Sequence, residues 1–130
     1  MSASLTIDGA VARLTLERPD SLNALNRQVA SALEEALKRL ERAADVTVVI
    51  VSGRGRAFCA GNDIAEMPTL AAAEAQAVSR RWQGIMDRFA RLPQVTIAAV
   101  RGYARAAAAC WPPRRISGSP RRACSSACRR

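Results

Sequence analysis

Small residues dominate a segment that can bind an anion, residues 53–64, which reads Gly-Arg-Gly-Arg-Ala-Phe-Cys-Ala-Gly-Asn-Asp-Ile. The segment follows an apolar run, and glycine and alanine at a strand end let a ligand approach the main chain closely. A loop that exposes Ala60 and Gly61 can aim peptide N–H groups at a developing negative charge, as an oxyanion hole does. The segment is neither a Walker A loop nor a G-x-G-x-x-G fingerprint, so spacing alone leaves a plain turn and an anion-binding loop as equal alternatives.

The other reactive side chains offer less chemistry. The chain has four cysteines and no histidine, so Cys59 lacks a base that would activate it as a nucleophile, and we expect it to be a packing residue. Cys124 and Cys128 have a spacing that a helix can use for metal binding, but two thiolates make a poor zinc site, and we predict no metal site. Asp63 can either transfer protons or cap the turn that follows it, and capping is the more common role beside a tight loop.

The flanking residues predict the elements that position this segment. Residues 4–7 and 11–16 alternate polar and apolar side chains around Asp8-Gly9, a dipeptide suited to a tight hairpin turn. Apolar residues at helical spacing predict an amphipathic helix over residues 29–40. The nearly unbroken β-branched run at residues 46–51 predicts a strand that is covered on both faces.

A further helix and strand are predicted beyond the loop. The apolar stripe at residues 78–89 predicts a helix in which Trp82, Met86 and Phe89 are core residues rather than a ligand site. Pro93 ends this helix before another apolar strand at residues 95–100. Strand, helix and strand recur, so the predicted class is α/β, with a sheet covered by helices.

The positive charge is concentrated at one end of the chain. The net charge is +9, yet residues 1–100 carry 12 basic and 11 acidic residues, whereas residues 101–130 carry eight arginines and no acid. We therefore expect one domain at residues 1–105 and a disordered tail at residues 106–130, which lacks apolar periodicity. The N-terminus has no secretory-signal pattern and no apolar run of about 20 residues occurs, so we expect a cytoplasmic protein without membrane contact.

Three motifs resemble the enoyl-CoA hydratase/isomerase (crotonase) family in their order and spacing. They are residues 17–25, which include Glu-Arg-Pro and Leu-Asn-Ala-Leu, residues 55–64, and residues 97–104, Ile-Ala-Ala-Val-Arg-Gly-Tyr-Ala. The resemblance covers residues 4–105, which correspond to the first half of a family domain. It implies a spiral of ββα units, a homotrimer or hexamer, an acyl-CoA substrate, and no cofactor other than the coenzyme A of that substrate.

The resemblance also implies roles for individual residues. The peptide N–H of Ala60 would be one of two donors to the thioester oxygen of the substrate, and the second would come from the turn at Ala107. The implied reaction is the addition of water to an enoyl-CoA, or migration of its double bond, through a thioester enolate. The positions that correspond to substrate contacts are Ser21, Leu22, Ala60, Gly61, Asn62, Asp63 and Ile64.

The chain departs from the family pattern after residue 105. Family hydratases use two glutamates beyond the glycine turn, and this chain has no Asp or Glu after Asp87, so we expect it to be truncated and inactive as written. The chain has 19 arginines and one lysine, which indicates a GC-rich gene. Reading the codons of Cys110, Trp111 and Pro112 one base earlier gives Leu and then Ala, and the allowed continuation resembles the family. We hypothesise a frameshift near residues 105–109 and an out-of-frame tail.

Two alternatives to an active enzyme follow from these features. A half domain is expected to leave the apolar strands at residues 46–51 and 95–100 partly exposed and prone to association. Residues 101–130 can instead be a nucleic-acid-binding arm, since their eight arginines can contact phosphates. Trp111 is the only aromatic residue of residues 106–130, and an out-of-frame origin also explains the arginines, so the family interpretation is preferred.

Overall fold

The structure is a computed structural model that describes residues 2–66, 71–104 and 115–117. It opens with a β-hairpin, in which strand β1 (Ala3–Asp8) pairs antiparallel with strand β2 (Val11–Leu16). Gly9 in the connecting turn has a φ of 56°, a left-handed conformation that glycine adopts at little cost. The hairpin predicted around Asp8-Gly9 is confirmed.

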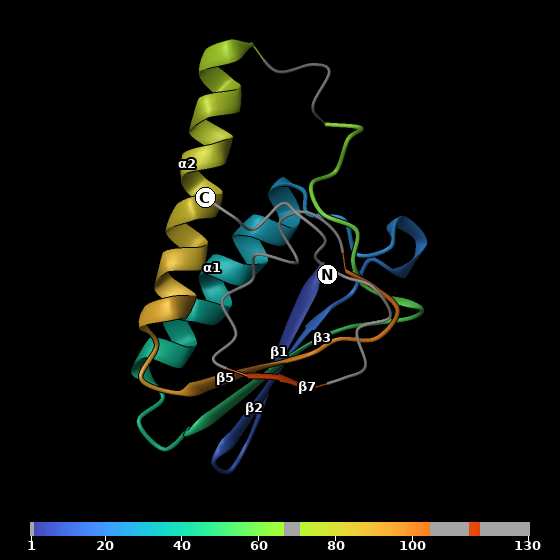
Figure 1. The fold of residues 1–130 in the computed structure, drawn as a ribbon. Helices are drawn as coiled ribbons and strands as arrows, with labels where there is room; N and C mark the ends of the chain where they lie inside the picture. Colours follow the sequence, from blue (N-terminus) through green and yellow to red (C-terminus); the bar gives the residue numbers. More distant parts are fainter. Residues whose placement is uncertain (1, 67–70, 105–114, 118–130) are drawn as a thin grey trace.

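Two helices and the remaining strands follow in α/β order. Helix α1 (Arg27–Arg42) precedes strand β3 (Val48–Gly53), and helix α2 (Ala72–Arg91) precedes strand β5 (Val95–Ala99). The main sheet has the order β1-β2-β3-β5-β7, and every pair after the hairpin is parallel. Figure 1 shows both helices on the same side of this sheet. The predicted α/β class is confirmed.

Strand β7 (Arg115–Ser117) was not expected from the sequence. It pairs in parallel with β5 at the edge of the sheet, although it falls within residues 106–130, for which disorder is predicted. Its three residues correct that expectation. The rest of the predicted tail lies outside the described residues.

The core lies between the helices and one face of the sheet. Leu14, Val51 and Ala98 occupy one register row across β2, β3 and β5, and all three are buried. The facing side chains of α1 are also buried, because apolar residues recur at helical spacing along it; they are Val29, Ala30, Leu33, Ala36, Leu37 and Leu40. Burial of a leucine side chain stabilises a fold by about 2 kcal/mol, so these rows are the main source of stability.

The opposite face of the sheet is less covered. Val48 and Ile50 of β3 are half-buried, as is Ile97 of β5, and Val95 is 39% exposed. Residues 46–51 were predicted to form a strand covered on both faces, but the two described helices cover only one. The exposure of Val95 and the half-burial of Val48, Ile50 and Ile97 agree with the expectation that the strands at residues 46–51 and 95–100 are partly exposed.

Two ion pairs join the helices along their solvent-facing edge. Arg81 of α2 donates to both carboxylate oxygens of Glu34 at 2.8 and 2.7 Å, and Arg88 does the same to Glu41 at 2.8 and 2.9 Å. The hydrogen bonds from the two arginines hold the pKa of each glutamate below its ordinary value of 4.5. Within the described part of the chain, neither helix has the length and apolar character needed to cross a membrane.

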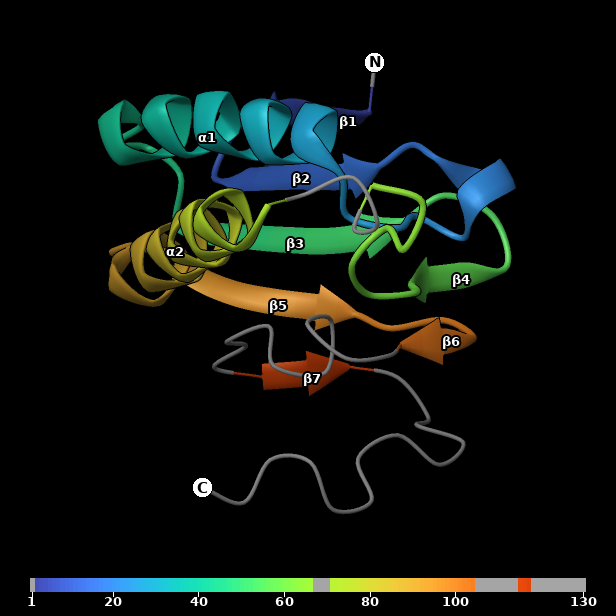
Figure 2. The same cartoon turned by 90° about the horizontal axis from the view of Figure 1, so that it is seen from above.

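A second, two-stranded sheet lies beyond the carboxyl ends of the long strands. Strand β4 (Ala57–Cys59) pairs in parallel with strand β6 (Tyr103–Ala104). Figure 2 shows this pair next to the ends of β3 and β5, on the side where β2 also ends. The loops that leave β2 and β4 are therefore brought to one edge of the molecule.

Candidate active site

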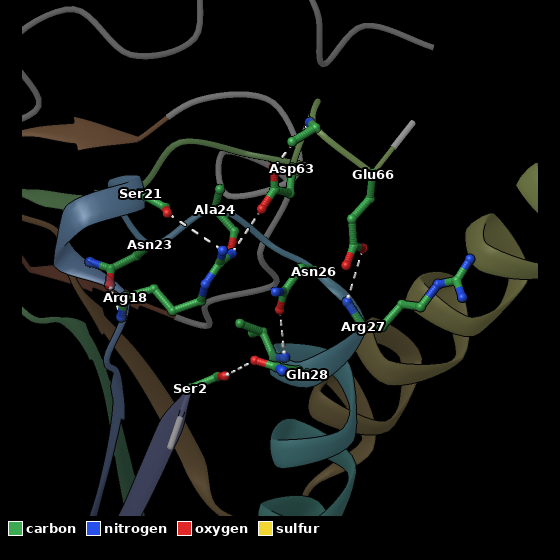
Figure 3. Close-up of polar contacts among 12 residues, drawn as sticks. Ser2, Arg18, Ser21, Asn23, Ala24, Asn26, Arg27, Gln28, Asp63 and Glu66 are labelled. Carbon is green, nitrogen blue, oxygen red and sulfur yellow. Dashed lines mark hydrogen bonds and ion pairs between the residues drawn. The ribbon is translucent and has the colours of Figure 1, made fainter. Parts of the chain in front are cut away.

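The residues predicted to carry the chemistry lie at the carboxyl ends of the parallel strands. One segment, residues 18–26, follows β2, and the other, residues 60–66, follows β4 (Figures 2 and 3). Ligands of α/β proteins bind outside this edge, because the loops that leave neighbouring parallel strands converge there. We call these two stretches the first and second site segments.

The first site segment begins with a short 3-10 helix, Pro19–Ser21, followed by two left-handed residues. Leu22 has a φ of 51° and Asn23 a φ of 56°, a conformation that costs a leucine about 1–2 kcal/mol. The buried Asn23 side chain offsets this cost: its Oδ1 accepts the N–H of Arg18 at 2.9 Å, and its Nδ2 donates to the carbonyls of Arg54 and Ala57 at 2.9 and 2.8 Å. Asn23 therefore fixes the turn against the β3–β4 connection.

The two site segments pair through their main chains. The N–H of Ala60 donates to the carbonyl of Leu22 at 3.0 Å, the N–H of Leu25 to Gly61 at 2.8 Å, and the N–H of Asp63 to Leu25 at 3.0 Å. Leu25 and Asn62 thus form a parallel bridge. In this pattern the N–H of Asn62 points away from Leu25, because its two neighbours make the hydrogen bonds of the bridge.

The buried Cys59 thiol accepts a hydrogen bond from one more N–H of the second site segment. The N–H of Gly61 lies 3.4 Å from Cys59 Sγ. Burial raises the pKa of Cys59 to about 11, and the Gly61 N–H acts weakly in the opposite direction. The thiol is therefore neutral near pH 7, as expected for a packing residue.

Among the main-chain N–H groups of residues 60–63, that of Asn62 differs from the others in its hydrogen bonding. The N–H groups of Ala60, Gly61 and Asp63 all have partners, and that of Asn62 has none among the residues that the structure describes. Asn62 is also an exposed residue, and it lines the cavity described below. The predicted donor, Ala60 N–H, is already used by Leu22.

Arg18 joins the two site segments through its side chain, as Figure 3 shows. Its Nη1 donates to the carbonyl of Ala24 at 2.7 Å and to Asp63 Oδ2 at 3.0 Å, and its Nη2 lies 3.4 Å from Ser21 Oγ. The other carboxylate oxygen of Asp63 accepts the N–H of Ala65 at 3.1 Å. Asp63 therefore caps the turn that follows it.

The start of α1 closes the site on its other side. Asn26 Oδ1 accepts the N–H of Val29 at 2.9 Å, which is an N-cap, and Glu66 Oε2 accepts the N–H of Arg27 at 3.2 Å. The carboxylate of Glu66 thus satisfies a free helix N–H from a distant part of the chain. This contact ties the end of the second site segment to α1.

A cavity of about 530 Å³ adjoins Asn62 and extends between the two helices. Its wall is apolar along α2, where Val78, Trp82 and Met86 face it, and polar near the second site segment. Trp82 and Met86 also pack against the hydrophobic core. The lining consists of Leu25, Arg27, Ala30, Asn62, Asp63, Glu66, Ala75, Val78, Ser79, Arg81, Trp82, Gln83, Met86 and Asp87.

The structure brings together most of the residues predicted to form the site. Ser21 and Leu22 lie in the first segment, and residues 60–64 in the second, where Ile64 is 79% exposed. Ala107 lies outside the described residues. Arg18 and Asn23 also belong to the candidate site, although the sequence predicted no role for either residue within the motif at residues 17–25. Among the described residues, no group of three or more His, Cys, Asp or Glu side chains is placed to hold a metal ion.

Comparison with known proteins gives one consistent result. Residues 6–110 match the sequence model of the enoyl-CoA hydratase/isomerase family. A probable enoyl-CoA hydratase of Mycobacterium tuberculosis is 40% identical over 117 residues, which cover 85% of this chain and 43% of that protein. A 1,2-epoxyphenylacetyl-CoA isomerase of Escherichia coli is 36% identical over 107 residues, covering 79% and 41%.

Solved structures agree with the sequence matches. The crystal structure of an enoyl-CoA hydratase of Mycobacterium smegmatis superposes with a TM-score of 0.81 and 34% identity, over 84% of this chain and 43% of that one. The predicted crotonase-like fold is thereby confirmed. The chain spans about two fifths of the length of the relatives it matches.

Proposed function

This chain belongs to the enoyl-CoA hydratase/isomerase family, and from that membership we propose that it binds the thioester carbonyl of an acyl-CoA at the main-chain N–H of Asn62. The observation that carries the proposal is the donor census: Asn62 has the one N–H of residues 60–63 without a partner within the described structure. The donor expected from the sequence was the N–H of Ala60. We propose the N–H of Asn62 instead, because the Ala60 N–H already donates to the carbonyl of Leu22 at 3.0 Å.

The pairing of the two site segments makes Asn62 a preorganised donor. The hydrogen bonds on either side of it, Leu25 to Gly61 and Asp63 to Leu25, hold the peptide in place before a ligand arrives. A donor that needs no reorganisation stabilises an oxyanion best, and the loss of one such donor typically costs about 3 kcal/mol of transition-state stabilisation. A second donor from the turn at Ala107 remains part of this proposal.

The cavity beside Asn62 is the proposed site of the acyl group. A carbonyl at the Asn62 N–H would place the acyl chain against Leu25 and the apolar wall made by Trp82 and Met86. The coenzyme A portion would then lie along Ser21 and Leu22 of the first site segment. Family membership further suggests a cytoplasmic trimer or hexamer and no cofactor beyond the coenzyme A of the substrate.

We propose that these 130 residues polarise the carbonyl of an enoyl-CoA but do not convert the substrate. Addition of water or movement of a double bond needs a group that transfers protons. The chain has no Asp or Glu beyond Asp87, where the family resemblance places the two glutamates of hydratases. Of the carboxylates that line the cavity, Asp63 is bonded to Arg18 and the N–H of Ala65, and Glu66 to the N–H of Arg27, whereas Asp87 lies on α2. We therefore expect binding and polarisation of an enoyl-CoA without its conversion.

Absorption spectroscopy with a chromophoric thioester tests the proposal. The absorption of 4-dimethylaminocinnamoyl-CoA moves to longer wavelength when its carbonyl accepts a hydrogen bond, because the excited state carries more negative charge on that oxygen. The expected result is saturable binding with a red shift that an excess of a saturated acyl-CoA reverses. Binding without a shift would contradict the donor role, and no binding would contradict the whole proposal.

A further inference from the structure

The guanidinium of Arg18 hydrogen-bonds to both site segments at once: Nη1 lies 2.7 Å from the carbonyl of Ala24 and 3.0 Å from Asp63 Oδ2. We infer that Arg18 is a positioning residue, which aims the N–H of Asn62 by clamping the two segments together. The inference rests on the proposed function, since it concerns the same donor. Arg18 itself does not touch the substrate in this scheme.

The clamp acts on the residues that flank the donor. Ala24 precedes Leu25, whose N–H and carbonyl bond to the residues on either side of Asn62. Asp63 follows Asn62, and its carboxylate links Arg18 to the N–H of Ala65. A single guanidinium nitrogen therefore holds both sides of the bridge that turns the Asn62 N–H outward.

The contacts of Arg18 favour a positioning role over a purely stabilising one. The side chains of Arg18 and Asp63 are 22% and 15% exposed, so the pair is mostly shielded from water, and its loss is expected to lower stability as well as to release Asp63. The main chain of Arg18 is held independently, since its N–H donates to Asn23 Oδ1 at 2.9 Å. Loss of the guanidinium therefore leaves the first turn in place and releases the second segment.

Without Arg18, the Asp63 carboxylate keeps only the N–H of Ala65 among its contacts within the described residues. The loop is then joined to the first site segment by three main-chain hydrogen bonds, and to α1 by the contact between Glu66 and the N–H of Arg27. Loops held by few contacts open locally at low cost in free energy. The direction of the Asn62 N–H becomes variable, and its preorganisation toward a carbonyl is lost.

The first test of this clamp needs no ligand. Arg18→Met keeps the unbranched stem and removes every donor, and Arg88→Met is the matched control, because it removes an arginine pair to Glu41 away from the site. Amide ¹⁵N relaxation of the full chain should show increased nanosecond motion in residues 60–65 of Arg18→Met only, with α1 and α2 unchanged. Equal order in residues 60–65 of all three proteins would overturn the inference.

The second test uses 4-dimethylaminocinnamoyl-CoA. Arg18→Met is expected to retain binding and to lose most of the red shift, Arg18→Lys to recover part of it because one ammonium can reach both acceptors, and Arg88→Met to match the unmodified chain. A full red shift in Arg18→Met would overturn the positioning role. A missing shift in the unmodified chain would instead refute the proposed donor, and the relaxation data would then decide the clamp independently.

Discussion

Leu25 and Asn62 form a parallel bridge between two loops that lie 37 positions apart in the chain, and this bridge determines which peptide N–H is free. The N–H and carbonyl of Leu25 are bonded to Gly61 and Asp63 at 2.8 and 3.0 Å. Asn62 is left with an outward-facing donor beside a cavity of about 530 Å³. The donor proposed at Asn62 therefore depends on main-chain geometry rather than on the Asn62 side chain.

Asn62→Pro is expected to abolish the red shift of bound 4-dimethylaminocinnamoyl-CoA, because proline has no N–H. Asn62→Ala is the control: it keeps the N–H and removes only an exposed side chain, so the shift should persist. Absorption spectra at saturating probe concentration measure both variants, and circular dichroism confirms that each is folded. Loss of the shift in Asn62→Ala as well would assign the effect to the amide side chain and contradict a main-chain donor.

Sequence patterns were sufficient for the elements but not for the donor. Alternation around Asp8-Gly9 and the β-branched run at residues 46–51 are local signals, and the structure confirms strands at both places. The hydrogen bond from the Ala60 N–H to Leu22 depends on the register between two loops that are distant in sequence. No local sequence pattern encodes this register. The spacing of small residues therefore predicts the loop, whereas the proposed choice of Asn62 over Ala60 as the donor depends on this register.

The first site segment shows the same limit of local patterns. A left-handed Asn23 agrees with the known preference of asparagine, whereas a left-handed Leu22 does not. The conformation of Leu22 is imposed by the three hydrogen bonds of the neighbouring Asn23 side chain, which join it to Arg18, to Arg54 in the β3–β4 connection and to Ala57 at the start of β4. That connection is remote in sequence, so neither the turn nor the role of Arg18 beside it follows from residues 17–25 alone.

Two glycine substitutions are expected to change stability in opposite directions. A Cβ on Gly53 would collide with the carbonyl of Phe58 and lie 2.6 Å from that of Ala57, so Gly53→Ala should lower the free energy of unfolding by about 2 kcal/mol. Gly84 is exposed in α2 and a Cβ there meets nothing within 4 Å, so Gly84→Ala should raise it by about 0.8 kcal/mol. Urea denaturation measures both, and a destabilised Gly84→Ala would contradict the described exposure of that helix face.

Acid is expected to weaken the contact between α1 and α2. The hydrogen bonds from Arg81 and Arg88 hold the pKa of Glu34 and Glu41 below 4.5 in the folded chain. The two pairs therefore contribute fully above the unfolded value of about 4.5, and the contribution is lost as the pH falls through the lower folded pKa. Exposed pairs are each worth about 0.5 kcal/mol, so the effect is small.

The double variant Glu34→Gln/Glu41→Gln isolates this contribution. Its free energy of unfolding should lie below that of the unmodified chain near pH 7, and the difference should shrink below about pH 4. Urea denaturation across that range provides the comparison. A difference that is independent of pH would show that the carboxylate charges are not responsible.

The coding DNA tests the hypothesis of an out-of-frame tail. The family match ends at residue 110, close to residues 105–109, where the frameshift is placed. Translation of the alternate frame beyond Ala109 is expected to give Leu, Met or Val, then Leu and Ala, and then a sequence similar to the family. An alternate frame that is interrupted by stop codons or unrelated to the family would refute the hypothesis.

The chemical shift of the Asn62 amide proton tests the central claim most directly. In a ¹⁵N-labelled chain titrated with 4-dimethylaminocinnamoyl-CoA, the Asn62 N–H signal should move downfield with saturation, because it donates to the thioester oxygen. The Ala60 signal should change little, since its N–H remains bonded to Leu22 at 3.0 Å. A downfield shift at Ala60 with an unchanged Asn62 signal would contradict the account and restore the donor first expected from the sequence.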